Sequence, residues 1–216
     1  MQPTILFDMD GVLIDSELHW DRLLPDFIQK IAPKFLPSDM HKVQGLSNLS
    51  LYHWLKEHYQ IPMTSEEFLP WLADFADEIY RGPVALMPGV FDLIQGLHQK
   101  KITMAIVSSS PLRHIKIVRQ RFGLDSCFPQ IFSAEMVGGI GKPDPEVYLL
   151  AAKELQVSPK HCIAIEDSRN GIASARAAGM QVIALKSEQN QSQDLSQANF
   201  IVEGFHPEIR SLILGF

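Results

Sequence analysis

Three short, continuous apolar runs constrain the fold of this chain more than any other feature of its sequence. They lack the alternation of apolar and polar residues that marks a half-exposed strand, so each is typical of a strand buried on both faces of a parallel sheet. The runs cover residues 4–7, 102–107 and 162–165, and two weaker ones cover residues 181–185 and 200–202. We therefore expect a parallel sheet that other elements cover on both sides.

Helical patterns separate the later runs. One begins at Ser110 and Pro111, which we expect to be the N-cap and the first-turn residue, and it ends at Gly123. Two more helices are predicted over residues 144–155 and 168–178. Strands that alternate with helices indicate right-handed βαβ units, so the expected fold class is α/β with a doubly wound parallel sheet.

Residues 16–84 break this alternation, because they contain several amphipathic helical segments and no convincing buried strand. They predict an inserted α-helical domain, which leaves residues 1–15 and 85–216 to form the main domain. Within the insertion, Pro25 predicts a kink or a helix boundary. Tryptophans at helical spacing are usually packing residues, and we expect this of all three. They are Trp20, Trp54 and Trp71.

Two helix starts are predicted inside the insertion. Thr64 followed by Glu67 has the spacing of a capping box, in which each side chain accepts a hydrogen bond from the other residue's backbone. Ser47 and Ser50 are candidates to cap an earlier helix.

Charge and cysteine content narrow the class of protein. With 19 Lys and Arg against 25 Asp and Glu the net charge is −6, which gives no electrostatic basis for binding nucleic acid or an anionic membrane surface. No apolar run approaches the ~18 residues of a membrane span, and no basic, apolar leader precedes Asp8. The two cysteines are too few for a disulfide framework. We expect a cytoplasmic protein that is a monomer rather than an oligomer.

Polar residues follow each of the three strong apolar runs, where a doubly wound sheet binds its ligands. Residues 8–11 follow the first run, residues 108–110 the second and residues 166–168 the third. Several carboxylates in one crevice repel each other unless a cation lies among them, and oxygen ligands without His or Cys favour Mg²⁺ over Ca²⁺. Lys142, before a predicted helix, can supply the fixed positive charge that a phosphoryl group needs.

The residues after the first run have a spacing of their own. Asp8 and Asp10 are two residues apart, so in an extended chain their side chains point into one cavity, and Gly11 would allow a sharp turn. Each of these features alone is common for unrelated reasons. Their occurrence together at equivalent ends of successive strands predicts a metal-assisted site for phosphate chemistry.

With these motifs the sequence resembles the haloacid dehalogenase-like hydrolase superfamily, and within it the phosphatases with a small helical cap. The matching stretches are residues 7–12, Ser108, residues 141–145 and residues 166–168 with Gly171. Their order and spacing agree with the family's four motifs along nearly the whole chain. In addition, residues 15–22 resemble the branch that includes hexitol and 2-deoxyglucose-6-phosphate phosphatases.

The resemblance implies a role for each matching residue. Asp8 would be the nucleophile that forms an aspartyl-phosphate, and Asp10 would protonate the leaving alcohol and then deprotonate water. Ser108 and Lys142 would bind the phosphoryl oxygens. The Mg²⁺ ion would be held by the Asp8 carboxylate, the Asp10 main-chain carbonyl and Asp167, with Glu166 a direct or an indirect ligand.

The resemblance further implies that the helical insertion closes over the site and recognises the leaving group. Substrate-binding candidates are proposed by position alone. They are Glu17, Gly45, Leu46, Ser47 and Asn48 in the insertion, and Ser109 next to Ser108.

These expectations lead to a function with two alternatives. The predicted enzyme is a Mg²⁺-dependent phosphatase that hydrolyses small phosphate monoesters, chiefly sugar or polyol phosphates, through an aspartyl-phosphate. The similar β-phosphoglucomutases share its motifs, but they have a histidine where this chain has Trp20 and an arginine where it has Asn48; His19, one position away, keeps this alternative open. The second alternative is a non-catalytic phosphoacceptor, which would be phosphorylated once and then stop.

Overall fold

The computed structural model describes residues 2–43 and 48–215. The chain divides into two compact units, one formed by Met1–Asp15 with Ala85–Phe216 and the other by Ser16–Val84. We call them the α/β unit and the helical unit.

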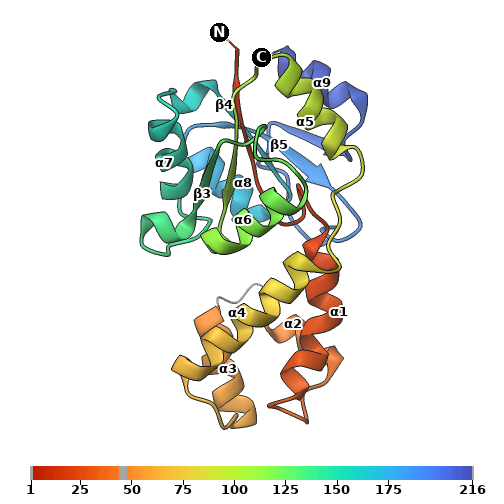
Figure 1. Ribbon diagram of the computed structural model, residues 1–216, viewed down its shortest axis with the longest axis vertical. Helices are drawn as coiled ribbons and strands as arrows, with labels where there is room; N and C mark the ends of the chain where they lie inside the picture. Colours follow the sequence, from red (N-terminus) through yellow and green to blue (C-terminus); the bar gives the residue numbers. More distant parts are fainter. Residues whose placement is uncertain (1, 44–47, 216) are drawn as a thin grey trace. The chain divides into compact units, whose positions relative to one another are not determined.

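A parallel sheet of six strands forms the centre of the α/β unit, in the order β3-β2-β1-β4-β5-β6 (Figure 1). The strands are β1 Thr4–Phe7, β2 Met104–Ser108, β3 Gln130–Ser133, β4 Cys162–Glu166, β5 Gln181–Lys186 and β6 Phe200–Glu203. The chain enters the sheet at β1, adds β2 and β3 on one side, and then adds β4 to β6 on the other. The winding direction therefore reverses between the neighbouring strands β1 and β4, where doubly wound sheets bind ligands.

The predicted α/β class with a doubly wound parallel sheet is confirmed, and all five predicted strands are present. Strand β2 begins two residues later than predicted and extends through Ser108. Strand β3, Gln130–Ser133, was not predicted from the sequence. This strand lies at the edge of the sheet and its first two residues are not buried, so it lacks the continuous apolar run by which the central strands were found.

Helices cover both faces of this sheet. They are α5 Val90–Gln99, α6 Leu112–Arg121, α7 Glu146–Glu154, α8 Arg169–Ala177 and α9 Pro207–Leu214, with short 3₁₀ segments η2 Ala134–Val137 and η3 Pro159–His161. A buried cluster joins α7 and α8 to one face, through residues such as Leu6 and Val107 on the strands and Val147 and Ile172 on the helices. Helices α5 and α9 contact each other on the opposite side of the sheet (Figure 1).

The predicted start of α6 is wrong in one detail. The N-cap residue is Pro111, which has no side-chain capping hydrogen bond, and not Ser110. The hydroxyl of Ser110 instead donates a hydrogen bond to Asp10 Oδ2 at 2.7 Å. A capping hydroxyl accepts a hydrogen bond from a backbone N–H, whereas the Ser110 hydroxyl donates to a carboxylate, which gives a stronger, charge-assisted hydrogen bond.

The helical unit contains four helices and one 3₁₀ segment among its described residues. They are α1 Ser16–Gln29, η1 Pro37–Asp39, α2 Met40–Val43, α3 Asn48–Tyr59 and α4 Ser65–Arg81. Pro25 lies inside α1, so it is not a helix boundary. Ser50 lies within α3 and is not its cap, whereas Ser47 lies outside the described residues.

Stacked aromatic rings hold α1 against α4. Phe27 stacks on Trp71 and Phe75 with ring centroids 3.6 and 3.9 Å apart, and Trp20 meets Phe75 edge to face at 5.7 Å. On α3, Trp54 stacks on His58 at 4.4 Å. The prediction that the three tryptophans are packing residues is confirmed.

Helix α4 begins as predicted. Thr64 is its N-cap residue and forms a capping box with Glu67, in which Glu67 Oε2 accepts from Thr64 N at 2.9 Å. None of the helices in the described ranges combines the length and the apolar character that a membrane span requires.

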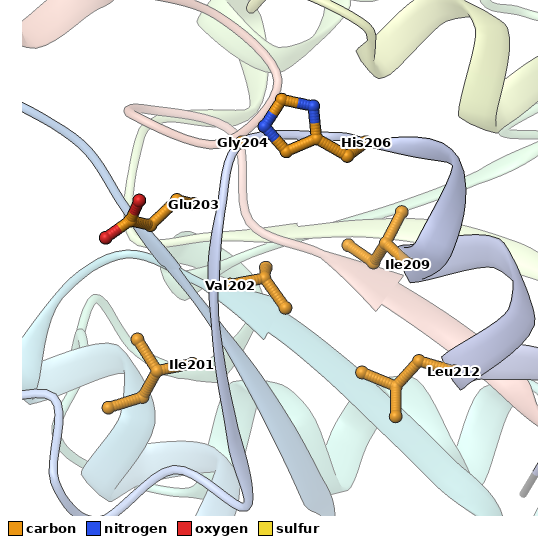
Figure 2. Close-up of a pocket in the computed structure, with 7 residues that line it drawn as sticks. All are labelled: Ile201, Val202, Glu203, Gly204, His206, Ile209 and Leu212. Atoms are coloured by element: carbon orange, nitrogen blue, oxygen red, sulfur yellow. The ribbon is translucent and has the colours of Figure 1, made fainter.

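A pocket of about 620 Å³ lies beside β6 and α9 (Figure 2). Its walls are mainly apolar, with Glu203 and His206 as the charged or titratable side chains. It is lined by Ile201, Val202, Glu203, Gly204, His206, Ile209 and Leu212. None of these is a residue that we predict to take part in the chemistry, and the carboxylates described next lie elsewhere.

Candidate active site

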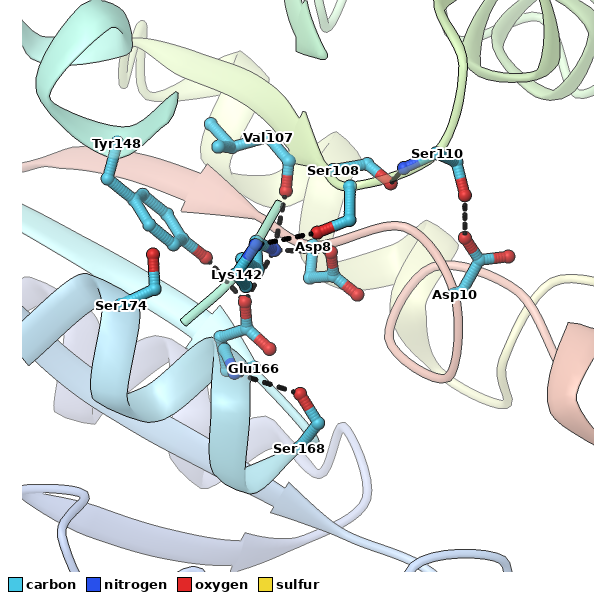
Figure 3. Close-up of polar contacts among 12 residues, drawn as sticks. Asp8, Asp10, Val107, Ser108, Ser110, Lys142, Tyr148, Glu166, Ser168 and Ser174 are labelled. Atoms are coloured by element: carbon cyan, nitrogen blue, oxygen red, sulfur yellow. Dashed lines mark hydrogen bonds and ion pairs between the residues drawn. The ribbon is translucent and has the colours of Figure 1, made fainter. Parts of the chain in front are cut away.

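The predicted site residues of the α/β unit come together at the carboxyl ends of its strands. Asp8 directly follows β1, Ser108 is the last residue of β2, and Glu166 is the last residue of β4. Lys142 reaches the same place from the loop that precedes α7 (Figure 3). Parallel strands end at the same edge of a sheet, so topology brings together the three strand-end residues from distant parts of the chain, and the loop adds Lys142 to them.

Lys142 is the centre of the polar contacts. Its Nζ donates to Asp8 Oδ1 at 2.6 Å, to Glu166 Oε1 at 2.6 Å and to the Val107 carbonyl at 2.9 Å. The side chain is only 6% exposed. Burial by itself would lower the pKa of Lys142, but the charges of Asp8 and Glu166 and the hydrogen bonds to them raise it above its usual range. Lys142 is therefore a fixed positive charge beside Asp8.

Tyr148, on α7, is a residue of this site that the sequence analysis missed. Its hydroxyl donates to Glu166 Oε1 at 2.6 Å, and its ring lies 5.0 Å from Lys142 Nζ in a cation–π contact. The side chain is fully buried. A signal was available, because a tyrosine on the buried face of a predicted helix needs a partner for its hydroxyl.

Three carboxylates at this edge could hold a metal ion. Asp8, Glu166 and Asp167 are all buried. One carboxylate oxygen from each lies within 4.8 Å of one such oxygen from each of the other two. Glu166 Oε2 has no hydrogen-bond partner among the described residues, although it is inaccessible to solvent. An oxygen-only ligand set of this kind fits a hard divalent cation.

The electrostatics of Asp8 support the same interpretation. Burial raises the pKa of Asp8 to about 8. The positive charge of Lys142 lowers this pKa, whereas the negative charges of Glu166 and Asp10 raise it further. The single positive charge of Lys142 does not balance the negative charges that Asp8, Glu166 and Asp167 carry when all three are ionised. A bound cation would favour the ionised form of Asp8 that a nucleophile requires.

Two glycines make room for the carboxylates. Gly11 has a φ of +75°, as expected for a sharp turn after Asp10. A Cβ atom on Gly11 would overlap the Asp167 carboxylate, and one on Gly171 would overlap the Glu166 carboxylate. Both acidic side chains therefore lie directly against main chain where only glycine fits.

Asp10 faces a different partner from Asp8. Its Oδ2 accepts the hydrogen bond from Ser110, and its carboxylate is not among the three that could share an ion. The proposed ligand role of its main-chain carbonyl stays a prediction. The two aspartates thus have different hydrogen-bond partners, Asp8 a lysine and Asp10 a hydroxyl (Figure 3).

The remaining candidates are placed as follows. Ser108 is buried and its Oγ accepts from Ser110 N at 3.0 Å. Ser109 Oγ accepts from Lys142 N at 3.1 Å, so this residue fastens the loop that carries the lysine. Glu17 and Asn48 are exposed, in the first turns of α1 and α3. Gly45, Leu46 and Ser47 lie outside the described residues.

Comparison with known families and proteins gives a consistent result. The model of a family described as haloacid dehalogenase-like hydrolase matches residues 3–179. A probable pseudouridine-5'-phosphatase of Drosophila melanogaster is 30% identical over 219 residues, covering 94% of this chain and 91% of the relative. Hexitol phosphatase B of Escherichia coli K12 is 30% identical over 189 residues, covering 87% of this chain and 85% of the relative.

Solved structures resemble the whole chain as well. CbbY from Rhodobacter sphaeroides, solved in complex with phosphate, superposes with a TM-score of 0.85 at 23% identity and full coverage of both chains. A putative β-phosphoglucomutase from Thermotoga maritima has a TM-score of 0.77 at 26% identity, covering 100% of this chain and 97% of the other. These likenesses extend over both units of the chain.

Proposed function

This chain belongs to the haloacid dehalogenase-like hydrolase family and is a phosphoric monoester hydrolase, and we propose that it hydrolyses small sugar or polyol phosphates through a phosphorylated Asp8. The observation that carries the proposal is the position of Lys142 Nζ, 2.6 Å from both Asp8 Oδ1 and Glu166 Oε1. A buried, permanently charged lysine next to an aspartate that directly follows the first strand is suited to bind a phosphoryl group in line with that aspartate.

The reaction proceeds in two displacements at phosphorus. In the first, an Asp8 carboxylate oxygen forms a bond to phosphorus while the bond to the leaving oxygen breaks, and Asp10 gives its proton to the departing alcohol. In the second, Asp10 takes a proton from water as the water oxygen attacks the phosphorus of the aspartyl-phosphate. The bond to Asp8 then breaks, and inorganic phosphate leaves with both carboxyl groups restored to their initial states.

Ser108 and Lys142 stabilise the charge on the non-bridging phosphoryl oxygens in both steps. We propose Mg²⁺ as the cation for Asp8, Asp167 and Glu166, because a hard ion fits three buried carboxylates whose Glu166 Oε2 has no hydrogen-bond partner within the described part of the chain. When bound, Mg²⁺ would neutralise charge on the phosphoryl group and lower the pKa of Asp8.

The choice of a sugar or polyol phosphate follows the named relatives, among them hexitol phosphatase B and a phosphorylated carbohydrates phosphatase of Thermotoga maritima. Leaving-group recognition is assigned to Glu17, Gly45, Ser47 and Asn48, with Ser109 on the α/β unit. Substituting Glu17 or Asn48 by alanine should change the ranking of substrates more than the turnover of a small, featureless ester such as p-nitrophenyl phosphate.

The test is release of inorganic phosphate from a panel of sugar, polyol and nucleotide monoesters, with Mg²⁺ and with EDTA. We expect multiple turnovers with Mg²⁺, loss of activity in EDTA and recovery when Mg²⁺ is restored. Asp8→Asn should remove all turnover and keep the fold, as judged by circular dichroism. Normal steady-state rates in that variant would contradict the nucleophile assignment.

The same panel separates the alternatives. Conversion of glucose-1-phosphate to glucose-6-phosphate with a bisphosphate primer, without net phosphate release, would identify a mutase. A single phosphorylation event per protein molecule, followed by no turnover, would identify a phosphoacceptor.

A further inference from the structure

The hydroxyl of Ser110 is bound to the residue that the proposed function makes the acid and base. Ser110 Oγ donates to Asp10 Oδ2 at 2.7 Å, although the two residues are 100 positions apart (Figure 3). Asp10 follows β1 and Ser110 follows β2, and these strands pair in parallel. The contact therefore joins two loops at the edge of the sheet where Asp8 and Lys142 meet.

The backbone of Ser110 is held by hydrogen bonds at both its N–H and its carbonyl group. Its N–H donates to Ser108 Oγ at 3.0 Å, and its carbonyl accepts from Ser133 Oγ at 2.8 Å. Ser133 is fully buried at the end of β3, and its Oγ also accepts from Glu135 N at 3.2 Å. The ends of two neighbouring strands, β2 and β3, thus fix the backbone of Ser110, so its hydroxyl is presented to Asp10 from a rigid support.

No helix cap competes for this hydroxyl, because Pro111 is the N-cap residue of α6. Ser110 also lies outside the polar contacts of Lys142, whose Nζ bonds to Asp8, Glu166 and Val107. Its side-chain hydrogen bond therefore reaches one member of the proposed mechanism, the acid and base, and neither the nucleophile nor the lysine.

We propose that Ser110 is a positioning residue that fixes the orientation of Asp10 for proton transfer. The inference rests on the proposed function. The hydrogen bond to Oδ2 restricts rotation of the Asp10 carboxyl group, which passes its proton to the leaving alcohol and later takes a proton from water. Ser110 keeps its own proton throughout and contributes by restricting the carboxylate to one orientation.

A positioning role predicts a dependence on the leaving group. Departure of an alkoxide from a sugar phosphate needs protonation, whereas p-nitrophenolate departs without it. The value of kcat/KM reports events up to formation of the aspartyl-phosphate, so it isolates the step in which Asp10 acts as an acid. A general loss of structure or of phosphate binding would lower kcat/KM for both substrates alike.

The experiment compares Ser110→Ala with the wild type on the sugar phosphate that is turned over fastest and on p-nitrophenyl phosphate. We expect kcat/KM for the sugar phosphate to fall between about 10- and 100-fold, and kcat/KM for the aryl ester to fall far less. Ser110→Thr, which keeps a hydroxyl, should restore most of the sugar-phosphate activity. Should the alanine variant not fold, Ser110→Cys repeats the comparison with a weak donor of similar shape.

A double-variant cycle provides the decisive control. Asp10→Asn alone should lose typically 10²–10⁴-fold in rate on the sugar phosphate. Adding Ser110→Ala to Asp10→Asn should cost little more, because the group that Ser110 positions is already gone. Additive losses, equal losses on both esters, or full activity of Ser110→Ala would each overturn the proposal.

Failure of this inference is distinguishable from failure of the proposed function. If the wild type releases no phosphate, or if Asp10→Asn is fully active, the phosphatase mechanism itself is wrong. If Asp10→Asn is impaired while Ser110→Ala behaves as the wild type, only the positioning role of Ser110 is wrong.

Discussion

The α/β unit and the helical unit are stabilised in different ways. At its strand ends the α/β unit buries Asp8, Glu166 and Lys142 in direct contact. The helical unit buries aromatic rings instead, with Phe27 stacked between Trp71 and Phe75. The ion pair between Lys42 and Asp39 in this unit involves a lysine side chain that is 48% exposed.

The difference shows which region is adapted to chemistry at a cost in stability. Removing charges from water carries a desolvation penalty that their mutual attraction only partly offsets, so a buried charge cluster is retained for its activity rather than for folding. Burying rings is favourable by itself. Substitutions should therefore affect turnover mainly in the α/β unit and stability in both.

The largest expected effect comes from removing the lysine. Lys142→Met leaves the buried carboxylates of Asp8 and Glu166 without their cation, so we expect no measurable turnover and a free energy of unfolding lower by roughly 3–5 kcal/mol. Added Mg²⁺ should raise the melting temperature of this variant more than that of the wild type. Lys153→Met, at an exposed position on α7, is the matched control. Substantial activity without Lys142 would contradict its assignment.

A comparable loss of stability is expected from the ring stack of the helical unit. Phe27 is 5% exposed, and Phe27→Ala should lower the free energy of unfolding by roughly 3–5 kcal/mol in a urea titration. Phe91, on α5, is 44% exposed, so Phe91→Ala should have little effect. Equal effects of the two substitutions would mean that the stack does not hold α1 and α4 together.

A matched pair of tyrosines compares the units directly. Tyr148→Phe removes the 2.6 Å hydrogen bond to Glu166, which should lower the free energy of unfolding by about 1–3 kcal/mol and raise the Mg²⁺ concentration needed for half-maximal activity. Tyr52→Phe removes a 3.4 Å hydrogen bond to the Met63 carbonyl, so its effect should be smaller. An unchanged Mg²⁺ dependence in Tyr148→Phe would argue against Glu166 as a metal ligand.

The smallest effect concerns the start of α4. Thr64→Ala removes one half of the capping box and should lower the free energy of unfolding by about 0.5–2 kcal/mol, with turnover unchanged. Thr64→Ser keeps the hydroxyl and should retain the wild-type melting temperature. A loss of turnover in Thr64→Ala without a loss of stability would show that this helix start has a role in catalysis.

The elements that the sequence predicts correctly are those with a strong local pattern. The central strands were found because both of their faces are buried, so their runs are continuously apolar apart from a single threonine in two of them. Strand β3 was missed because an edge strand needs only one buried face and can be short. The capping box at Thr64 was found because its two residues interact with each other's backbone, without help from the rest of the fold.

The residues of the candidate site likewise fall into those that the sequence could locate and those that it could not. Asp8, Ser108, Glu166 and Asp167 could be located because each lies at the end of a strand, and strand order sends those ends to one edge. The role of Tyr148 and the hydrogen bond of Ser110 to Asp10 could not be predicted in this way. Both depend on which way a side chain turns between several available acceptors, and that choice is made only when distant segments are packed together.

By itself the sequence determined the α/β class, the helical insertion and the set of polar residues at the strand ends, because apolar periodicity and local capping act over a few neighbouring residues. The tertiary structure alone decided the ion pairs of Lys142, the carboxylate group of Asp8, Glu166 and Asp167, and the turn of the Ser110 hydroxyl from helix cap to Asp10. The ion pair of Lys142 with Asp8 joins residues 134 positions apart. Hydrogen bonds and contact ion pairs require their atoms to lie within about 3–4 Å of each other. Residues this far apart in the sequence reach such distances only when the whole chain has folded.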